Sequence, residues 1–433
     1  LSADLNIDLE QQLFVGNSVQ AGVVNLKLPS GLSTTGTLAA DTLQANLKSQ
    51  VLSAHGLSLN LKKLLLNATA PDLPLALSAK SVEVNLVKQT AQAEQFNLSV
   101  VGLNATGSVV ASDLSGNPQL AGQLSLAKFN PKQVLKNLKQ SAIATTDPKA
   151  LTSASLKTTF KATTNSVVMD DLKLTLDETA VTGNLSVANL AARNGIRFDL
   201  KAGVLNADQY MPPGSGGQAG TPGAGAAALP LDLLRGLDAK GSLFVKKLTL
   251  SNLILTDIDV KVEGKGGVLN VNPATALLYG GSYAGNISVD ARGKKGKLSV
   301  NEELKRVHIG PLLRDLNGND HIAGRGGMTI RAQAVGSTAD ELRKTLTGDA
   351  SILLKDGSFK GVDVVNTLCS GIAGLLGGGS SGGGETKFSD FQGTAKIVNG
   401  LIDNRDFVAR SPLLRINGGG TYDLPSDWIK YDV

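Results

Sequence analysis

A strict two-residue alternation constrains this chain more than any other feature. Residues 1–10 place an apolar side chain at every odd position and a polar one at every even position. Successive side chains of a β-strand point to opposite faces of the sheet. A period of two therefore predicts strands with one apolar face and one wet face.

The same alternation returns in runs as far as Leu354, with Gly, Asn and Asp turn signals between the runs, such as Ser115–Pro118 and Val398–Gly400. This pattern is typical of antiparallel strands joined by tight turns. We therefore expect a mainly β fold: a long curved antiparallel sheet that forms an apolar groove or half-open sandwich, with a few short helices.

Composition narrows the classes of function. The chain has 433 residues, of which 42% are hydrophobic and 4% aromatic, so its apolar content is almost entirely aliphatic and excludes a disordered chain. The net charge of +5 is spread thinly, and the densest basic run, Arg292–Lys297, fits a solvated turn. Nucleic-acid binders concentrate basic charge on one face, so we expect no nucleic-acid partner.

Helical signals are short. Asn130 and Pro131 start a helix over 132–138, Ser337–Glu341 starts one that Gly348 ends, Gly361–Leu376 is more apolar, and Pro311–Leu316 predicts a helical turn. Two linkers divide the chain. The expected segments are an N-terminal β-groove segment 1–210, a disordered Pro/Gly/Ala linker 211–229, a core 230–376, a Gly/Ser linker 377–384, and C-terminal strands 385–433 that pair with the core.

The residues that carry most enzymatic chemistry do not form a recognisable constellation. The three histidines lack ligand spacing, and the single Cys369 permits neither a disulfide within the chain nor a cysteine-based metal site. Asp315, Asn317 and Asn319 have the first spacings of a calcium loop, but Asp320 and Gly326 replace its glycine and final glutamate. We therefore expect no catalytic residue, no metal, no cofactor and no enzymatic activity.

The aliphatic face must be covered by another part of the protein or by a ligand, and few helices are available to cover it. A second sheet would make it an ordinary closed core, whereas an open groove would hold lipid tails, and periodicity does not distinguish the two. Burying a CH₂ group contributes about 0.8 kcal/mol, so a 16-carbon tail could contribute at most about 13 kcal/mol. The residues predicted to line a lipid groove are Leu5, Ile7, Leu9, Val82, Val84, Leu86, Leu172, Leu174, Leu176, Leu248, Leu250, Ile258, Val260, Val262, Leu269, Val271, Ile287, Val289, Ile330, Ile352 and Leu354.

The second half also resembles a known family. A set of short sequence segments, which occur in order over about residues 240–433, is similar to the core of the AsmA family. Looser matches at Phe129–Pro131 and Asp208–Tyr210 extend the resemblance upstream. The segments that resemble the core are Leu269–Pro273, Leu278–Gly285, Pro311–Leu316, Ile322–Gly326, Asp340–Leu342, Leu346–Ala350, Asp356–Asp363, Thr386–Ser389 and Gly418–Leu424.

The resemblance implies a periplasmic, non-enzymatic protein of the Gram-negative envelope, related to bridge-like lipid-transfer proteins such as TamB. It implies phospholipid or another acyl lipid as ligand, an inner-membrane anchor that lies N-terminal to this sequence, and a part in outer-membrane lipid homeostasis. The outer-membrane assembly machinery is the other partner it suggests. The alternative function is an assembly factor for outer-membrane β-barrel proteins, which would act through exposed strand edges.

Overall fold

The computed structural model describes residues 2–27, 33–65, 73–141, 143–192, 194–213, 229–361, 385–411 and 415–432. Contacts between its elements divide the chain into two units, Leu1–Leu200 and Lys201–Val433. Strands form most of the described residues in both units, and the helices are short. The prediction of a mainly β fold with a few short helices is confirmed.

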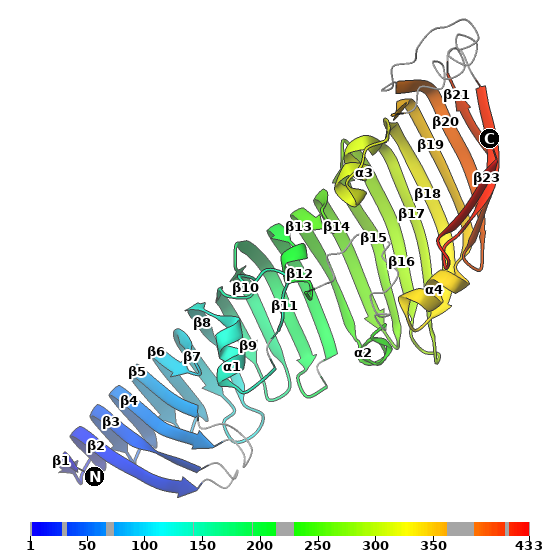
Figure 1. Cartoon of the computed structure of the whole chain (residues 1–433). Coiled ribbons are helices and arrows are strands. Elements are labelled where there is room, and N and C mark those ends of the chain that lie inside the picture. The colour runs from blue at the N-terminus through cyan, green and yellow to red at the C-terminus, as the bar shows by residue number, and fades with distance from the viewer. Residues whose placement is uncertain are drawn as a thin grey trace, which may run out of the picture. The chain divides into compact units, whose positions relative to one another are not determined.

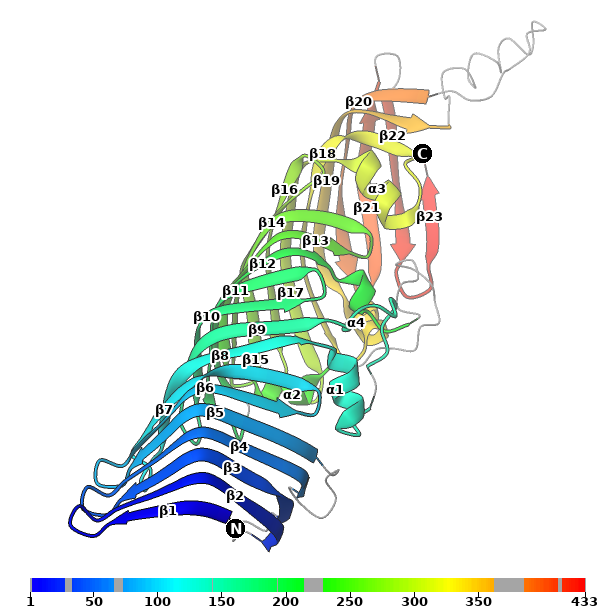
Figure 2. The ribbon, with the colours of Figure 1, turned by 90° about the vertical axis from the view of Figure 1, so that its left-hand side faces the viewer.

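The first unit is an antiparallel sheet in which each strand pairs with its neighbours in sequence, from β1 through β11 (Figures 1 and 2). The helix α1 (Pro131–Asn137) follows β8, and the boundary between the units falls within β12 (Asn194–Asn206). The strands are β1 (Ser2–Asp8), β2 (Leu13–Lys27), β3 (Ser33–Asn46), β4 (Val51–Leu65), β5 (Leu73–Asn85), β6 (Thr90–Val100), β7 (Leu103–Ser112), β8 (Gln119–Phe129), β9 (Ala154–Ala162), β10 (Val167–Leu176) and β11 (Thr179–Asn189).

The second unit repeats this order of pairing from β13 through β23, and its sheet is curved (Figure 1). Its strands are β13 (Ala239–Leu250), β14 (Leu253–Lys265), β15 (Val268–Leu278), β16 (Gly281–Asp290), β17 (Gly296–His308), β18 (Ile322–Gly336), β19 (Thr347–Lys360), β20 (Glu385–Val398), β21 (Leu401–Arg410), β22 (Arg415–Asp423) and β23 (Trp428–Asp432). Its helices are η1 (Asp208–Tyr210), α2 (Leu231–Gly236), α3 (Ile309–Asn317) and α4 (Ala339–Thr345).

Tight turns set the register of the hairpins. Val398 pairs with Leu401, and the two residues between them, Asn399 and Gly400, have φ angles of 50° and 81°. Two consecutive residues with positive φ are characteristic of a type I′ turn, whose twist matches that of the flanking strands. The turn predicted at Val398–Gly400 is therefore confirmed.

Three of the expected helices lie in the described residues. Asn130 caps α1 by accepting a hydrogen bond from the Gln133 amide, as the sequence predicted. The predicted helical turn at Pro311–Leu316 is the longer helix α3. α4 ends at Thr345, before Gly348, which instead lies in β19.

α2 and η1 were not predicted. The expected helix at Gly361–Leu376 and the linkers 211–229 and 377–384 lie mainly or wholly outside the described residues.

Candidate functional site

In the first unit, the strand registers align apolar side chains into three rows, of which two cross every strand from β1 to β11 and the third begins at β2. We call the three rows below the aliphatic face of the first unit. The first row is Leu5, Gly16, Leu43, Ala54, Val82, Ala93, Val109, Gly122, Phe160, Met169 and Leu185. The second is Ile7, Phe14, Ala45, Leu52, Val84, Ala91, Ala111, Leu120, Ala162, Val167 and Val187. The third runs from β2 through Ala21, Leu38, Leu59, Leu77, Leu98, Ala105, Leu126, Leu156, Leu174 and Val181.

The opposite face of the same sheet is polar. The alternation of side chains along each strand puts hydroxyl, amide and ammonium groups there, at positions between the aliphatic rows. One such row is Ser58, Ser78, Asn97, Thr106, Ser125, Lys157, Lys173 and Thr182. From β4 to β11, the sheet thus separates an aliphatic surface from a wet one.

No second layer formed by the described elements covers the aliphatic face of the first unit. Among the described elements, extensive strand contacts occur solely between strands that are hydrogen-bonded neighbours. Leu52 and Leu120, on central strands, keep 42% and 39% of their surface exposed. A closed core would bury these leucines almost completely. The face is therefore open, and the alternative of a closed sandwich is excluded for these strands.

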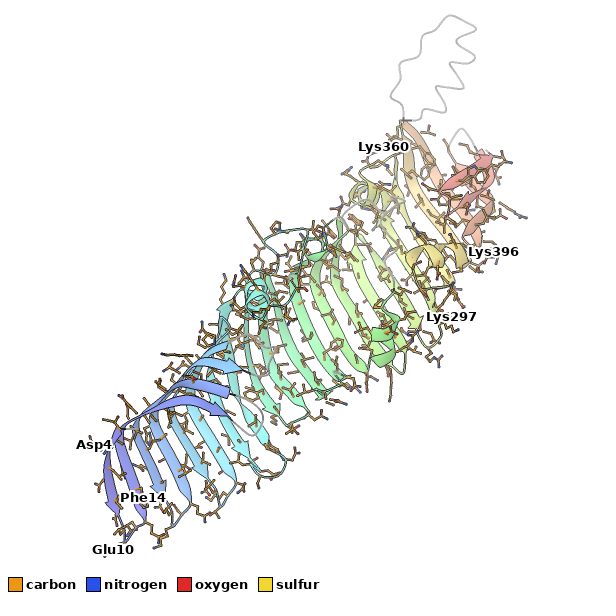
Figure 3. All side chains as sticks on the ribbon, turned by 60° about the horizontal axis from the view of Figure 1, so that its bottom comes forward. Asp4, Glu10, Phe14, Lys297, Lys360 and Lys396 are labelled. Carbon is orange, nitrogen blue, oxygen red and sulfur yellow. The ribbon has the colours of Figure 1, made fainter. Side chains whose placement is uncertain are left out.

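A cavity of about 450 Å³ lies on this face, over β1 to β5. Phe14 of β2, labelled in Figure 3, contributes to its wall. Gln44 and Ser53 are its only polar lining residues. The remaining lining residues are Ala3, Leu5, Phe14, Gly16, Val19, Leu43, Ala45, Leu52, Ala54, Val82 and Val84. Such a surface offers apolar contact with few groups that could form a hydrogen bond.

The second unit has the same organisation. We call its three rows, taken together, the aliphatic face of the second unit. One row is Gly241, Val262, Val271, Ile287, Val300, Ala332, Gly348, Ile397, Ile402, Tyr422 and Ile429. The central row is Leu243, Val260, Ala274, Gly285, Glu302, Ile330, Ala350, Ala395, Asn404, Gly420 and Tyr431. The third is Val245, Ile258, Ala276, Tyr283, Leu304, Met328, Ile352 and Gly393.

The opposite face of the second unit carries charges of both signs. Lys396 and Asp349, paired across β20 and β19, form an ion pair there. Lys297, Lys360 and Lys396 lie towards strand ends along the borders of this sheet (Figure 3). One row of this face is Asn286, Asn301, Arg331, Asp349, Lys396, Asp403, Thr421 and Lys430. The separation of an aliphatic from a wet surface is therefore a property of both units.

The helix α3 is tied to strand ends of the second unit. Tyr279, in the turn after β15, donates a hydrogen bond of 2.6 Å to Asp315 of α3. Burial, followed by this bond to a carboxylate, raises the pKa of Tyr279 to about 12. Asp320, after α3, pairs with Arg314 and with Lys360 of β19, and these two cations lower its pKa to about 2. Polar contacts thus hold α3 at one end of the strands.

The helices α2 and α4 are anchored near the start of β17, at the other end of the strands. Arg235 of α2 donates hydrogen bonds of 2.8 Å to the carbonyl oxygens of Ala291 and Gly293. In α4, Thr338 accepts a bond from the Glu341 amide, and the Glu341 carboxylate accepts one from the Ser337 amide. Such reciprocal capping defines the start of a helix. Short helices therefore flank the sheet at both ends of its strands.

One acidic residue interrupts the aliphatic face of the second unit. Glu302 of β17 lies in the central row, and both of its carboxylate oxygens are buried without a hydrogen-bond partner among the described residues. The Tyr283 hydroxyl lies beside it without meeting hydrogen-bond geometry. Burial raises the pKa of Glu302, and the Tyr283 hydroxyl offsets part of that rise. Burial, and then the adjacent carboxyl, raise the pKa of Tyr283.

The structure places most of the predicted lining residues on these faces. In the first unit, Leu5 and Val82 share one row, Ile7 and Val84 share the next, and Leu174 lies in the third. In the second unit, the rows contain Ile258, Val260, Val262, Val271, Ile287, Ile330 and Ile352. Leu269 pairs with Val289 one position beyond these rows, Leu172 and Leu354 are buried, and Leu176 lies at the end of β10.

Four predicted residues lie away from the rows. Leu9 and Leu86 are in turns, where they are 81% and 45% exposed, and Leu248 and Leu250 lie at the end of β13 beside its turn. When the position two residues beyond the end of a strand is also a leucine, the two-residue period continues into the turn. The period therefore does not reveal where a strand ends.

A second cavity, of about 830 Å³, lies on the polar face of the second unit. The Thr329 and Ser351 hydroxyls, 2.7 Å apart and hydrogen-bonded, are part of its wall. Lys305, Arg325 and Lys355 also line it. The sequence pattern did not indicate this cavity, because residues on the wet face vary without a period.

Two further observations bear on the class of protein. Within the described ranges, no three His, Cys, Asp or Glu side chains gather as a set of metal ligands. None of the helices in the described part of the chain is long and apolar enough to cross a membrane.

Comparison with known proteins gives one match. The model of the AsmA family matches residues 17–407. The match therefore extends far upstream of residues 240–433, where the similar segments are most evident. No curated protein and no solved structure matches the chain. Since the family model covers most of the sequence, the chain belongs to the AsmA family, a family of the bacterial envelope.

Proposed function

We propose that this protein binds phospholipid acyl chains on its aliphatic faces, without catalysing a reaction, and so contributes to outer-membrane lipid homeostasis. The observation that carries the proposal is the set of uninterrupted aliphatic rows of the first unit, over which none of the described strands packs as a second layer. Soluble monomers rarely leave so large an apolar surface without a ligand or partner.

The chemistry of the rows suits acyl chains. Leu, Val, Ile and Ala provide dispersion contacts and exclude water, and they have no polar group that would fix one position of a tail. Each buried CH₂ group contributes about 0.8 kcal/mol, so a tail of ordinary length would bind strongly even after the entropic cost of ordering it. A continuous row therefore supports movement of a tail from one strand to the next.

Membership of an envelope family supports a periplasmic location. We propose in addition that the full-length protein is anchored to the inner membrane and cooperates with the outer-membrane assembly machinery. Fractionation of cells that produce the full-length protein tests the anchor. Release of the protein with the soluble periplasmic fraction would contradict it.

The direct test is native mass spectrometry, with lipid extraction, of the 433-residue chain purified without detergent. The proposal expects phospholipid to co-purify at a reproducible ratio. A folded chain free of lipid, which also takes up none from phospholipid vesicles, would overturn it.

A second candidate function is the assembly of outer-membrane β-barrel proteins by strand addition. It is favoured by β23, which pairs with β22 alone among the described strands and whose residues are all exposed. The same mass-spectrometry experiment separates the two candidates, because strand addition requires no lipid. A lipid-free, folded chain that binds unfolded outer-membrane proteins would establish this second function.

A further inference from the structure

Glu302 is the only charged residue in the three rows of the second unit's aliphatic face. It lies near the middle of the sheet, between Gly285 of β16 and Ile330 of β18. Along its own strand, Val300 and Leu304 flank it on the same face. An acid in such surroundings costs stability, so its presence needs an explanation other than packing.

The carboxyl of Glu302 lies in the space over Gly285. A Cβ atom on Gly285 would clash with the carboxylate of Glu302 and with the hydroxyl of Tyr283, so both groups occupy the space above the glycine. The carboxylate oxygens are buried there, and neither has a hydrogen-bond partner among the described residues. A flexible side chain with two unused acceptors gains by rotating towards any donor that enters the face.

We propose that Glu302 is a recognition site for the protonated amine of an amphiphile whose tails lie on the aliphatic face. This inference rests on the proposed lipid-binding function and adds the class of head group. In the empty protein the carboxyl lies over Gly285. When an amine-bearing lipid arrives, the carboxyl rotates out and accepts its hydrogen bonds.

The chemistry selects among head groups. A primary ammonium offers a positive charge and three N–H donors, so it satisfies both the charge and the acceptors of the carboxylate. A quaternary ammonium offers charge without N–H donors, and an anionic head group is repelled. The expected order of preference is a primary amine, then a quaternary amine, then an anionic head group.

The test is competition between lipids for the 433-residue chain. The chain is incubated with vesicles of equimolar phosphatidylethanolamine and phosphatidylglycerol, re-isolated, and its bound lipids are quantified. We expect enrichment of phosphatidylethanolamine by roughly tenfold, the factor that one hydrogen bond to a charged group provides. Glu302→Gln, which keeps the shape and removes the charge, should abolish the enrichment and retain total lipid.

The matched control is Glu303→Gln. Glu303 is the next residue on the same strand but lies on the polar face, paired with Lys305 at 2.9 Å, so its replacement should leave the enrichment unchanged. A second test needs no variant. Phosphatidylethanolamine whose amine is acetylated should lose the enrichment on the unmodified chain.

The outcomes separate the two proposals. If no lipid binds to any form of the chain, the proposed function itself is wrong. If lipid binds but the ratio is the same for the unmodified chain and Glu302→Gln, or for amine and acetylated lipid, the recognition site is wrong while the lipid-binding function stands.

Discussion

Glu302 of β17 pairs directly with Gly285 of β16, and the glutamate carboxyl fills the space that a side chain at position 285 would occupy. Gly285 is buried and has an ordinary φ angle, so the reason for a glycine here is this close approach and not the backbone conformation. The glycine at position 285 therefore leaves the space that the Glu302 carboxyl occupies.

Gly285→Ala should expel the carboxyl of Glu302 from its place. Because the expelled carboxyl becomes hydrated, its raised pKa should fall towards the ordinary value of 4.5. Titration of the labelled Glu302 carboxyl by nuclear magnetic resonance measures the change. Gly236→Ala is the control, since an added Cβ there meets nothing within 4 Å. An unchanged pKa in Gly285→Ala would show that the carboxyl is not held where the structure places it.

The stability of the second unit should fall as the pH rises through the raised pKa of Glu302. The folded state holds the proton more tightly than the unfolded state, so the stabilising contribution is complete below pH 4.5 and is lost above the raised pKa. Tyr283, the ionisable group beside it, has a raised pKa and stays protonated in this range. Urea unfolding from about pH 4 to about pH 8 measures the slope. Glu302→Gln should remove this contribution, and an identical slope in that variant would assign it to other groups.

Val260→Asp and Val289→Asp should lower lipid occupancy more than they disturb folding. Both valines are half-buried on a single-layer sheet, so a new carboxylate can remain hydrated and should cost about 1 kcal/mol of unfolding free energy. Bound lipid is counted by mass spectrometry, and stability is followed by urea unfolding. Ser288→Asp, one residue from Val289 on the polar face, is the control and should retain its lipid. Complete unfolding of both variants would mean that the face is a packed core.

The strand pattern and its apolar parity could be predicted because they are local properties. Leu5, Ile7, Val82 and Val84 follow from the two-residue period alone, and their neighbours across the sheet follow from tight turns that keep each register. Whether a second sheet covers the face depends on contacts between distant strands, which a period does not report.

The position of Glu302 on the aliphatic face could not be predicted from the sequence, for a physical reason. It is followed by Glu303, and the pair looks like an ordinary exposed acidic step. Only the register with Gly285 and Ile330 shows that one of the two carboxylates lies among aliphatic rows. A break in the alternation between Val300 and Leu304 was the one signal that could have found it.

A ladder of aromatic rings should control the stability of the last strands of the second unit. Phe359 of β19, Phe388 and Phe391 of β20, Phe407 of β21 and Tyr431 of β23 contact one another in sequence, with ring centroids 4.9–6.0 Å apart. The low aromatic content of the whole chain, 4%, concealed this concentration in one place.

Phe388 is the most informative position in the ladder because it is 4% exposed and contacts the rings of both Phe359 and Phe391. Phe388→Ala should destabilise the second unit by about 3–5 kcal/mol, since it removes apolar area and leaves a cavity. Hydrogen exchange should then speed up first in β19 to β21, where the ladder joins the strands. Trp428→Ala, an exposed aromatic outside the ladder, is the control and should have little effect. Equal losses in the two variants would mean that the ladder adds no more to stability than an exposed ring does.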